Sequence, residues 1–221
     1  MKNHRVNSLF FDLDGTLFDT AADITTALNK VLQRYDQPVV SFDHVRQYVA
    51  LGSKAILTCG FSSEAPSFDM DQLRDEFLLD YRKHLVDQTT LYDGMADVLN
   101  YLDEARIPWG VVTNKPGWLA EPILVHFELN QRSRCLIAGD TLSERKPHPL
   151  PLFRACEIVG VNPNKSAYVG DTETDVQAAK AAGMLSILAQ YGYGTPHEVI
   201  NANSDTVIQQ PVDILRWLNQ S

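Results

Sequence analysis

Short apolar runs and helical periodicities alternate along this chain, and together they predict its elements. Residues 9–11 form an apolar run that predicts a buried strand. From residue 92 onward, helical stretches alternate with further apolar runs, which we expect to be strands at residues 108–112, 136–138, 166–169, 186–189 and 206–208. This alternation is typical of a parallel sheet with crossover helices. We therefore expect an α/β fold, a Rossmann-like parallel sheet core with helices on both faces.

The segment between the first strand and residue 88 has a different pattern. Residues 20–87 show helical spacing of apolar positions, a loop-like stretch at 62–68 and no convincing strand. This predicts an all-α domain inserted into the core. We expect residues 1–18 and 89–221 to form the core and residues 19–88 to form the helical insertion.

Composition narrows the possible partners and location. The 221 residues carry 19 Lys and Arg against 28 Asp and Glu, a formal net charge of −9, which argues against binding a nucleic-acid backbone. Residues 1–5 lack the apolar region of a signal peptide, and no apolar run approaches membrane-spanning length. Cys59, Cys135 and Cys156 are odd in number and widely spaced, as expected of reduced thiols in a cytoplasmic protein.

Two carboxylates follow the first predicted strand directly. Asp12 and Asp14 precede Gly15 and Thr16, where a strand gives way to a tight turn. Ligands of open parallel sheets bind beyond the carboxyl ends of the strands, so both acids are expected at the mouth of a site. Two acids this close repel each other, and a hard divalent cation such as Mg²⁺ would relieve that repulsion. A simple Asx-type turn is the alternative interpretation.

Three later stretches carry polar groups suited to the same site. Thr113 and Asn114 end one predicted strand, although such a stretch taken alone more often begins a turn. Lys146 lies next to prolines that restrict the backbone, although an exposed lysine is the more usual case. Asp171 ends another buried strand and could share a cation with Asp12, whereas a carboxylate at position 175 could simply favour the start of a helix.

In their order along the chain, these motifs resemble the haloacid dehalogenase superfamily of aspartate-nucleophile phosphotransferases. The match comprises D-x-D-G-T at 12–16, the strand end at 113–114, a lysine before P-x-P at 146–149 and G-D-x-x-x-D at 170–175. The helical insertion corresponds to the family's cap domain. Residues 111–116 and 178–183 are similar to the phosphoglycolate phosphatase branch, and residues 109–123 also resemble phosphatases of N-acetylmuramic acid 6-phosphate.

The resemblance implies a catalytic role for each of the first acids. Asp12 would attack phosphorus and form an aspartyl-phosphate. Asp14 would protonate the leaving alcohol and then activate the hydrolytic water. Mg²⁺ would be held by Asp12, the backbone carbonyl of Asp14 and Asp171.

The resemblance also implies which groups surround the phosphoryl oxygens. Thr113, Asn114 and Lys146 would hold these oxygens, and Asp175 would steady Lys146 or a metal-bound water. Lys115 competes with Lys146 as the phosphate lysine, but the family pattern favours Lys146.

The helical insertion offers one candidate contact to substrate. Gly52-Ser53-Lys54 matches the position of the family's specificity loop in the cap domain. Ser53 and Lys54 are therefore candidates to contact a carboxylate or hydroxyl of the leaving group. A solvated lysine near the start of a helix is the alternative interpretation.

The leading hypothesis is a Mg²⁺-dependent phosphomonoesterase that acts on a small metabolite, as a monomer or homodimer without nucleic-acid or membrane partners. Phosphoglycolate is the first candidate substrate and N-acetylmuramic acid 6-phosphate the alternative. A phosphonoacetaldehyde hydrolase and a phosphomutase are weaker hypotheses. A dehalogenase is disfavoured because halide needs no proton from Asp14, and a phosphate sensor because every catalytic position is filled.

Overall fold

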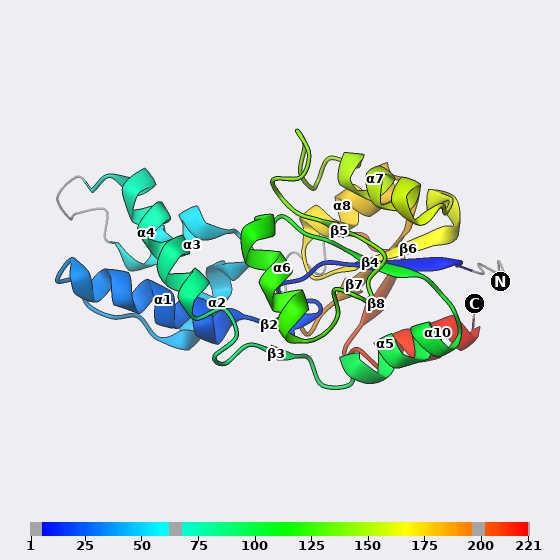
Figure 1. The fold of residues 1–221 in the computed structure, drawn as a ribbon, viewed down its shortest axis with the longest axis horizontal. Helices are drawn as coiled ribbons and strands as arrows, with labels where there is room; N and C mark the ends of the chain where they lie inside the picture. The colour runs from blue at the N-terminus through cyan, green and yellow to red at the C-terminus, as the bar shows by residue number, and fades with distance from the viewer. Residues whose placement is uncertain (1–5, 62–67, 196–201, 221) are drawn as a thin grey trace. The chain divides into compact units, whose positions relative to one another are not determined.

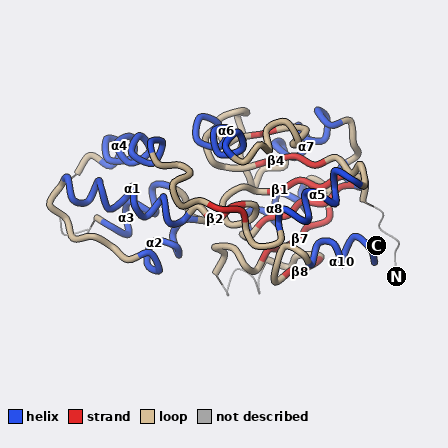
Figure 2. Tube along the Cα trace, turned by 60° about the horizontal axis from the view of Figure 1, so that its bottom comes forward, coloured by secondary structure: helices blue, strands red, loops and turns tan. Residues whose placement is uncertain are grey.

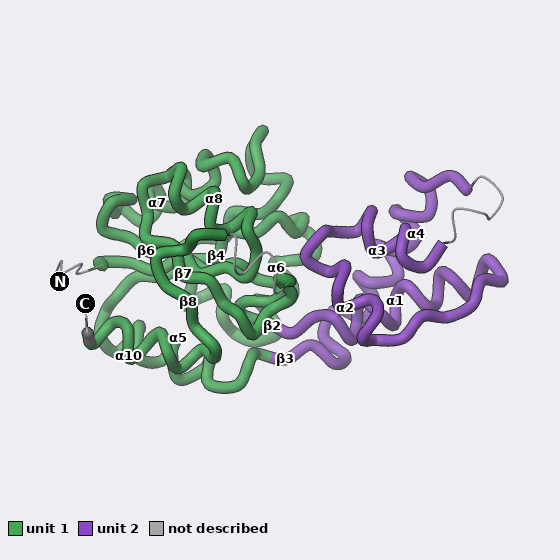
Figure 3. The backbone as a smooth tube through the Cα atoms, turned by 180° about the vertical axis from the view of Figure 1, so that it is seen from behind, with its two compact units in different colours: residues 1–18, 91–221 green, residues 19–90 purple. Residues whose placement is uncertain are grey.

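The computed structural model describes residues 6–61, 68–195 and 202–220. Residues 1–5, where we expect no signal peptide, and residues 62–67 of the expected loop lie outside these ranges. The chain divides into two compact units, Met1–Phe18 with Leu91–Ser221 and Asp19–Thr90 (Figure 3). The sequence places the second boundary at residue 88, two residues earlier.

A six-stranded parallel sheet forms the centre of the first unit (Figure 1). Its strand order is β5-β4-β1-β6-β7-β8. The strands are β1 (Ser8–Phe11), β4 (Trp109–Val112), β5 (Leu136–Ile137), β6 (Ser166–Gly170), β7 (Leu185–Ala189) and β8 (Thr206–Ile208). Every residue of β1, β4 and β6 is buried, as expected for parallel strands covered on both faces.

Helices cover both faces of this sheet. The helices α7 (Leu150–Val159) and α8 (Glu173–Ala181) lie on one face, and α5 (Met95–Glu104) and α10 (Asp213–Gln220) lie on the other (Figure 1). A further helix, α6 (Gly117–His126), connects β4 to β5. The expected α/β core with a Rossmann-like parallel sheet is confirmed.

The strand order fixes the position of the ligand site. The chain runs from β1 to β4 in one direction along the sheet, and from β6 to β7 in the other. The direction therefore reverses between β1 and β6, and the carboxyl ends of these two neighbours border the crevice where such sheets bind ligands.

The second unit is helical, as the sequence predicts (Figure 2). Its helices are α1 (Ala21–Arg34), α2 (Phe42–Val49), α3 (Ser53–Gly60) and α4 (Met70–Lys83). The buried carboxylate of Asp23 in α1 accepts backbone hydrogen bonds from Gln88 (3.0 Å) and Thr89 (2.9 Å). These bonds hold the end of the unit against its first helix.

Differences from the predicted elements are confined to short or terminal segments. The helical spacing expected to continue to residue 87 ends earlier, because α4 stops at Lys83. The sequence pattern does not reveal β2 (Phe18–Asp19) and β3 (Thr90–Leu91), which form a separate two-stranded sheet where the chain passes between the units. Two residues are too few for a period of two to be visible. In the described part of the chain, no helix is both long and apolar enough to span a bilayer.

Candidate active site

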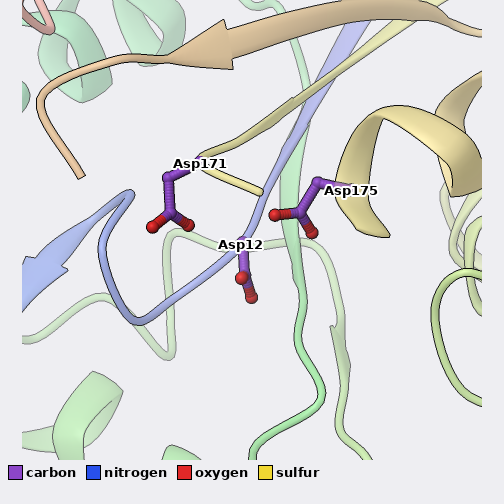
Figure 4. Close-up of side chains that lie close together, drawn as sticks. All are labelled: Asp12, Asp171 and Asp175. Carbon is purple, nitrogen blue, oxygen red and sulfur yellow. The ribbon is translucent and has the colours of Figure 1, made fainter. Parts of the chain in front are cut away.

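Asp12 and Asp171 stand side by side at the reversal point of the sheet. Asp12 follows β1, and its backbone N–H donates to the carbonyl of Val169 in β6 at 2.9 Å. Asp171 comes directly after β6. One carboxylate oxygen from each of Asp12, Asp171 and Asp175 lies within 4.8 Å of the other two, and Figure 4 shows these side chains gathered around one space.

Lys146 is the cation of this cluster. Its side chain is 2% exposed, and its Nζ lies 3.0 Å from Asp12 Oδ1 and 2.7 Å from Asp175 Oδ1. It also donates to the hydroxyl of Tyr168 at 2.6 Å. Burial alone would lower the pKa of Lys146, but the two carboxylates outweigh it and raise that pKa above its ordinary value. Lys146 is therefore held as an ammonium group.

Asp175 fixes Lys146 and the start of α8 at once. Its Oδ2 accepts from the backbone N–H and the hydroxyl of Thr172, while the Thr172 hydroxyl accepts from the Asp175 N–H. This reciprocal capping box makes Asp175 the third residue of the helix, whereas the sequence places it at the start. Its Oδ1 accepts from Lys146 at 2.7 Å, and the Tyr168 hydroxyl oxygen lies 3.4 Å from the same atom. Both oxygens of Asp175 are thus already engaged.

Among the residues that the structure describes, neutral groups donate the hydrogen bonds to Asp171. Its Oδ2 accepts the backbone N–H of Tyr193 at 2.7 Å, and its Oδ1 accepts the Thr16 hydroxyl at 3.3 Å. Burial and the repulsion of Asp175 and Asp12 raise the pKa of Asp171 well above its ordinary value.

The pKa of Asp12 is raised as well. Burial raises the pKa of Asp12 to about 6, against the attraction of Lys146. Its Oδ1 is buried, and within the described part of the chain no donor makes a hydrogen bond of good geometry to it, although Lys146 Nζ lies 3.0 Å away. An under-coordinated oxygen beside the carboxylate of Asp171 is the arrangement that a hard divalent cation would satisfy. The residues present therefore fit a metal held by Asp12 and Asp171.

Thr113 and Asn114 follow β4 at the same edge of the sheet. The Thr113 hydroxyl accepts from the backbone N–H of Lys115 at 3.2 Å. The Asn114 amide donates to the Lys146 carbonyl at 3.0 Å and accepts the Lys146 N–H at 3.1 Å. Asn114 therefore holds the backbone of Lys146 through two hydrogen bonds. Its residue type alone does not predict this role.

Asp14, the second acid of the first motif, forms an ion pair with Lys115. Lys115 Nζ lies 2.8 Å from Asp14 Oδ1, and the two side chains are 6% and 21% exposed. The structure thus pairs Lys146 with Asp12 and Lys115 with Asp14.

Two site features were not anticipated from the sequence. Tyr168 donates its hydroxyl hydrogen to the Val112 carbonyl at 2.7 Å and is a partner of Lys146. The segment after β7 brings Tyr193 to Asp171 and the Tyr191 hydroxyl to the carbonyl of Thr16 at 3.0 Å. The alternation of glycine and tyrosine at 191–194 is the available signal, because glycine allows a backbone to approach closely.

Ser53 and Lys54 begin α3 in the helical unit. The Ser53 hydroxyl accepts from the Arg74 guanidinium at 3.1 Å, and Lys54 is exposed. Their expected contact with substrate stays a prediction.

Comparison with known proteins adds a family to this geometry. The model of the haloacid dehalogenase-like hydrolases matches residues 9–189, which run from β1 to the end of β7 and include Asp12, Lys146 and Asp171. The chain is a haloacid dehalogenase-like hydrolase. The resemblance drawn from the motifs is confirmed.

Relatives of this hydrolase include two kinds of phosphatase. A phosphoglycolate phosphatase of Xanthomonas campestris is 40% identical over 205 residues, 92% of either chain. An N-acetylmuramic acid 6-phosphate phosphatase of Pseudomonas aeruginosa is 32% identical over 222 residues, 100% of this chain and 98% of the relative. Among solved structures, a predicted phosphoglycolate phosphatase from Haemophilus somnus has a TM-score of 0.88 at 26% identity and covers 96% of this chain and 98% of its own.

We predict that Gly15→Ala destabilises this hydrolase more than Gly160→Ala does. Both glycines have a left-handed φ, +78° and +75°, so each alanine costs about 1–2 kcal/mol in backbone strain. A Cβ at Gly160 meets nothing within 4 Å, whereas one at Gly15 would lie 2.2 Å from Asp171 Oδ2. Urea unfolding should show an additional loss of about 1–3 kcal/mol for Gly15→Ala. Equal losses would contradict the close packing of Gly15 on Asp171.

Proposed function

We propose that this chain is a Mg²⁺-dependent phosphomonoesterase that works through an aspartyl-phosphate on Asp12. The position of Asp12 carries the proposal: it stands at the reversal point of the sheet between a buried lysine and a second carboxylate. Its side chain is 14% exposed, so an incoming ester can reach it. Membership of the hydrolase family and the names of the relatives support the same chemistry.

In the first half of the reaction, a carboxylate oxygen of Asp12 attacks phosphorus. A new phosphorus–oxygen bond forms to Asp12, and the bond to the leaving oxygen breaks. The leaving alkoxide takes a proton from the Asp14 carboxyl group, which stands two residues after the nucleophile.

The second half returns the enzyme to its starting state. Asp14, now a carboxylate, accepts a proton from water as the water oxygen attacks phosphorus. The bond between phosphorus and Asp12 breaks, and inorganic phosphate leaves. One group thus serves as acid and then as base, as microscopic reversibility allows.

Lys146 and the strand end at Thr113 are placed to receive the phosphoryl oxygens. Lys146 offers a fixed positive charge, and the Thr113 hydroxyl can donate as well as accept. We assign Asn114 to holding the Lys146 backbone, because both ends of its amide are bonded there.

Asp12 and Asp171, together with the backbone carbonyl of Asp14, would hold Mg²⁺. When bound, the ion supplies the positive charge that screens an anionic nucleophile from an anionic ester. Asp175 is already committed to Lys146 and Thr172, so we place it outside the ligand set.

We propose phosphoglycolate as the first candidate substrate, since a phosphatase named for that ester shows 40% identity. The relative named for N-acetylmuramic acid 6-phosphate aligns over the whole chain and supports that ester as the alternative. Lys54 would contact a carboxylate or hydroxyl of the leaving group, and Ser53 would lie beside it in the same helix turn.

Location and assembly belong to the same proposal. The free thiols of Cys59, Cys135 and Cys156 suit a reducing compartment, so we infer a cytoplasmic enzyme. A small phosphate ester is its proposed partner, and we expect the protein to work as a monomer or homodimer.

We predict that Asp12→Asn lowers hydrolysis of p-nitrophenyl phosphate by more than about 1,000-fold, because an amide cannot act as the nucleophile. Steady-state release of p-nitrophenol measures the effect, and circular dichroism checks the fold. Asp97→Asn, an exposed change in α5, is the matched control and should keep normal turnover. Near-normal turnover by Asp12→Asn would remove the nucleophile assignment.

We also predict that chelation with EDTA stops turnover and that added Mg²⁺ restores it. Because Mg²⁺ would bind the folded state and not the unfolded state, adding it to the metal-free protein should raise the thermal unfolding midpoint, and more so at higher Mg²⁺ concentration. Asp171→Asn should lose most of this rise, whereas Asp97→Asn should keep it. Turnover in EDTA, or an undiminished rise in Asp171→Asn, would contradict the ligand set.

A substrate panel tests the leaving group. We predict that kcat/KM is highest for phosphoglycolate among phosphoglycolate, N-acetylmuramic acid 6-phosphate, sugar phosphates and phosphonoacetaldehyde. Lys54→Ala should reduce kcat/KM for the preferred ester by about tenfold, the typical effect of one lost charged contact. It should leave kcat/KM for p-nitrophenyl phosphate unchanged. Equal rates on all esters would count against selection by Lys54.

A further inference from the structure

Lys115 is a buried cation that the mechanism above does not use. Its side chain is 6% exposed, although lysine is seldom buried without an anionic partner. Its ammonium group donates to Asp14 Oδ1 at 2.8 Å. Asp14 is the acid and base of the proposed reaction, so this contact reaches the group that moves protons.

The backbone of Lys115 is anchored on both sides of the residue. Its N–H donates to the Thr113 hydroxyl, and its carbonyl accepts from the Gly139 N–H at 2.9 Å. A Cβ at Gly139 would lie 2.1 Å from the Asn114 carbonyl oxygen, so the loop after β5 packs closely on this turn. The lysine therefore extends from a fixed point.

Asp14 lies on a tight turn between β1 and Phe18. The N–H groups of Leu17 and Phe18 both donate to the Leu13 carbonyl, and the Gly15 N–H donates to the Phe18 carbonyl. These bonds set the backbone of the turn. The Asp14 side chain is partly exposed, and its ion pair with Lys115 restricts the rotamers that it can adopt.

The two buried lysines divide the acids of the first motif between them. Lys146 already meets Asp12, Asp175 and the Tyr168 hydroxyl, and so is engaged at the nucleophile. Lys115 meets the proton-transfer group instead. The two ammonium groups therefore differ in the step that each can influence.

We propose that Lys115 is a positioning residue that orients the Asp14 carboxyl group for proton transfer, and that it does not hold the phosphoryl oxygens. The proposal deepens the function proposed above and rests on it. Lys115 acts through Asp14, so its effect depends on how much the leaving group needs a proton. An alkoxide needs one, whereas p-nitrophenolate departs without it.

The test compares two esters in Lys115→Met. We expect kcat/KM for phosphoglycolate to fall about 10- to 100-fold, within the range of general acid catalysis, while kcat/KM for p-nitrophenyl phosphate changes by less than about threefold. The kcat for p-nitrophenyl phosphate should fall, because the later attack by water needs Asp14 as a base. Lys165→Met, an exposed lysine before β6, is the control and should change neither ester.

A double-mutant cycle isolates the interaction. In an Asp14→Asn background, Lys115→Met should cost nothing further on phosphoglycolate, because the group that it positions is gone. Lys115→Arg keeps the charge and should recover much of the activity. If Lys115→Met does not fold, Lys115→Arg replaces it in the comparison: kcat/KM for phosphoglycolate should again fall more than kcat/KM for p-nitrophenyl phosphate, but by a smaller factor. N-acetylmuramic acid 6-phosphate replaces phosphoglycolate if the panel prefers it, since both are alkyl esters.

Two results would overturn the proposal. Equal losses of kcat/KM on both esters, or a full loss that persists beside Asp14→Asn, would show that Lys115 acts on the phosphoryl group itself. Failure of the proposed function is distinct from either, because the wild-type protein would then hydrolyse neither ester.

Discussion

Three carboxylates, two of them buried and that of Asp12 partly exposed, lie near one buried ammonium group and form the constraint on which this site depends. Lys146 contacts Asp12 and Asp175. Asp171 instead accepts hydrogen bonds from two neutral donors, the Tyr193 N–H and the Thr16 hydroxyl. Burial and mutual repulsion raise the pKa of both Asp12 and Asp171. Negative charge without enough positive charge is costly inside a protein. The fold therefore brings together a set of groups that a cation would complete, before any phosphate ester adds its own charge.

Much of the surrounding structure serves to keep Lys146 in place. Asn114 holds its backbone on both sides, and Asp175 reaches it from the first turn of α8. Tyr168 supplies a hydroxyl from within β6. The contacts come from three separate elements, so a shift of any one of them would change the distance between Lys146 and the nucleophile. Such support from several elements is what a site needs to hold its geometry during catalysis.

The sequence predicts the residues of this site better than it predicts their contacts. Asp12 and Asp171 could be placed together because each ends a buried parallel strand, and such ends meet at one edge of a sheet. The grip of Asn114 on Lys146 could not be foreseen, because it joins residues far apart in the chain through an amide that serves equally well in turns. The same holds for Tyr193, which donates a hydrogen bond to Asp171 through its backbone N–H, a group that every residue except proline carries. Two-residue strands such as β2 are invisible for lack of length.

The pairing of each lysine with a different aspartate bears on how one motif performs two tasks. Asp12 and Asp14 are two residues apart and would repel each other, yet in the proposed reaction one attacks while the other exchanges a proton. Lys115 comes from the turn after β4 and Lys146 from the loop before α7, and each gives one of the two acids a separate counter-charge. A lysine at the nucleophile lowers the cost of bringing an anionic ester near it. A lysine at Asp14 instead restricts the direction of a side chain, and it matters most where the leaving oxygen cannot depart without a proton. The two cations are thus not interchangeable, although sequence alone offers both as candidates for the same phosphate contact.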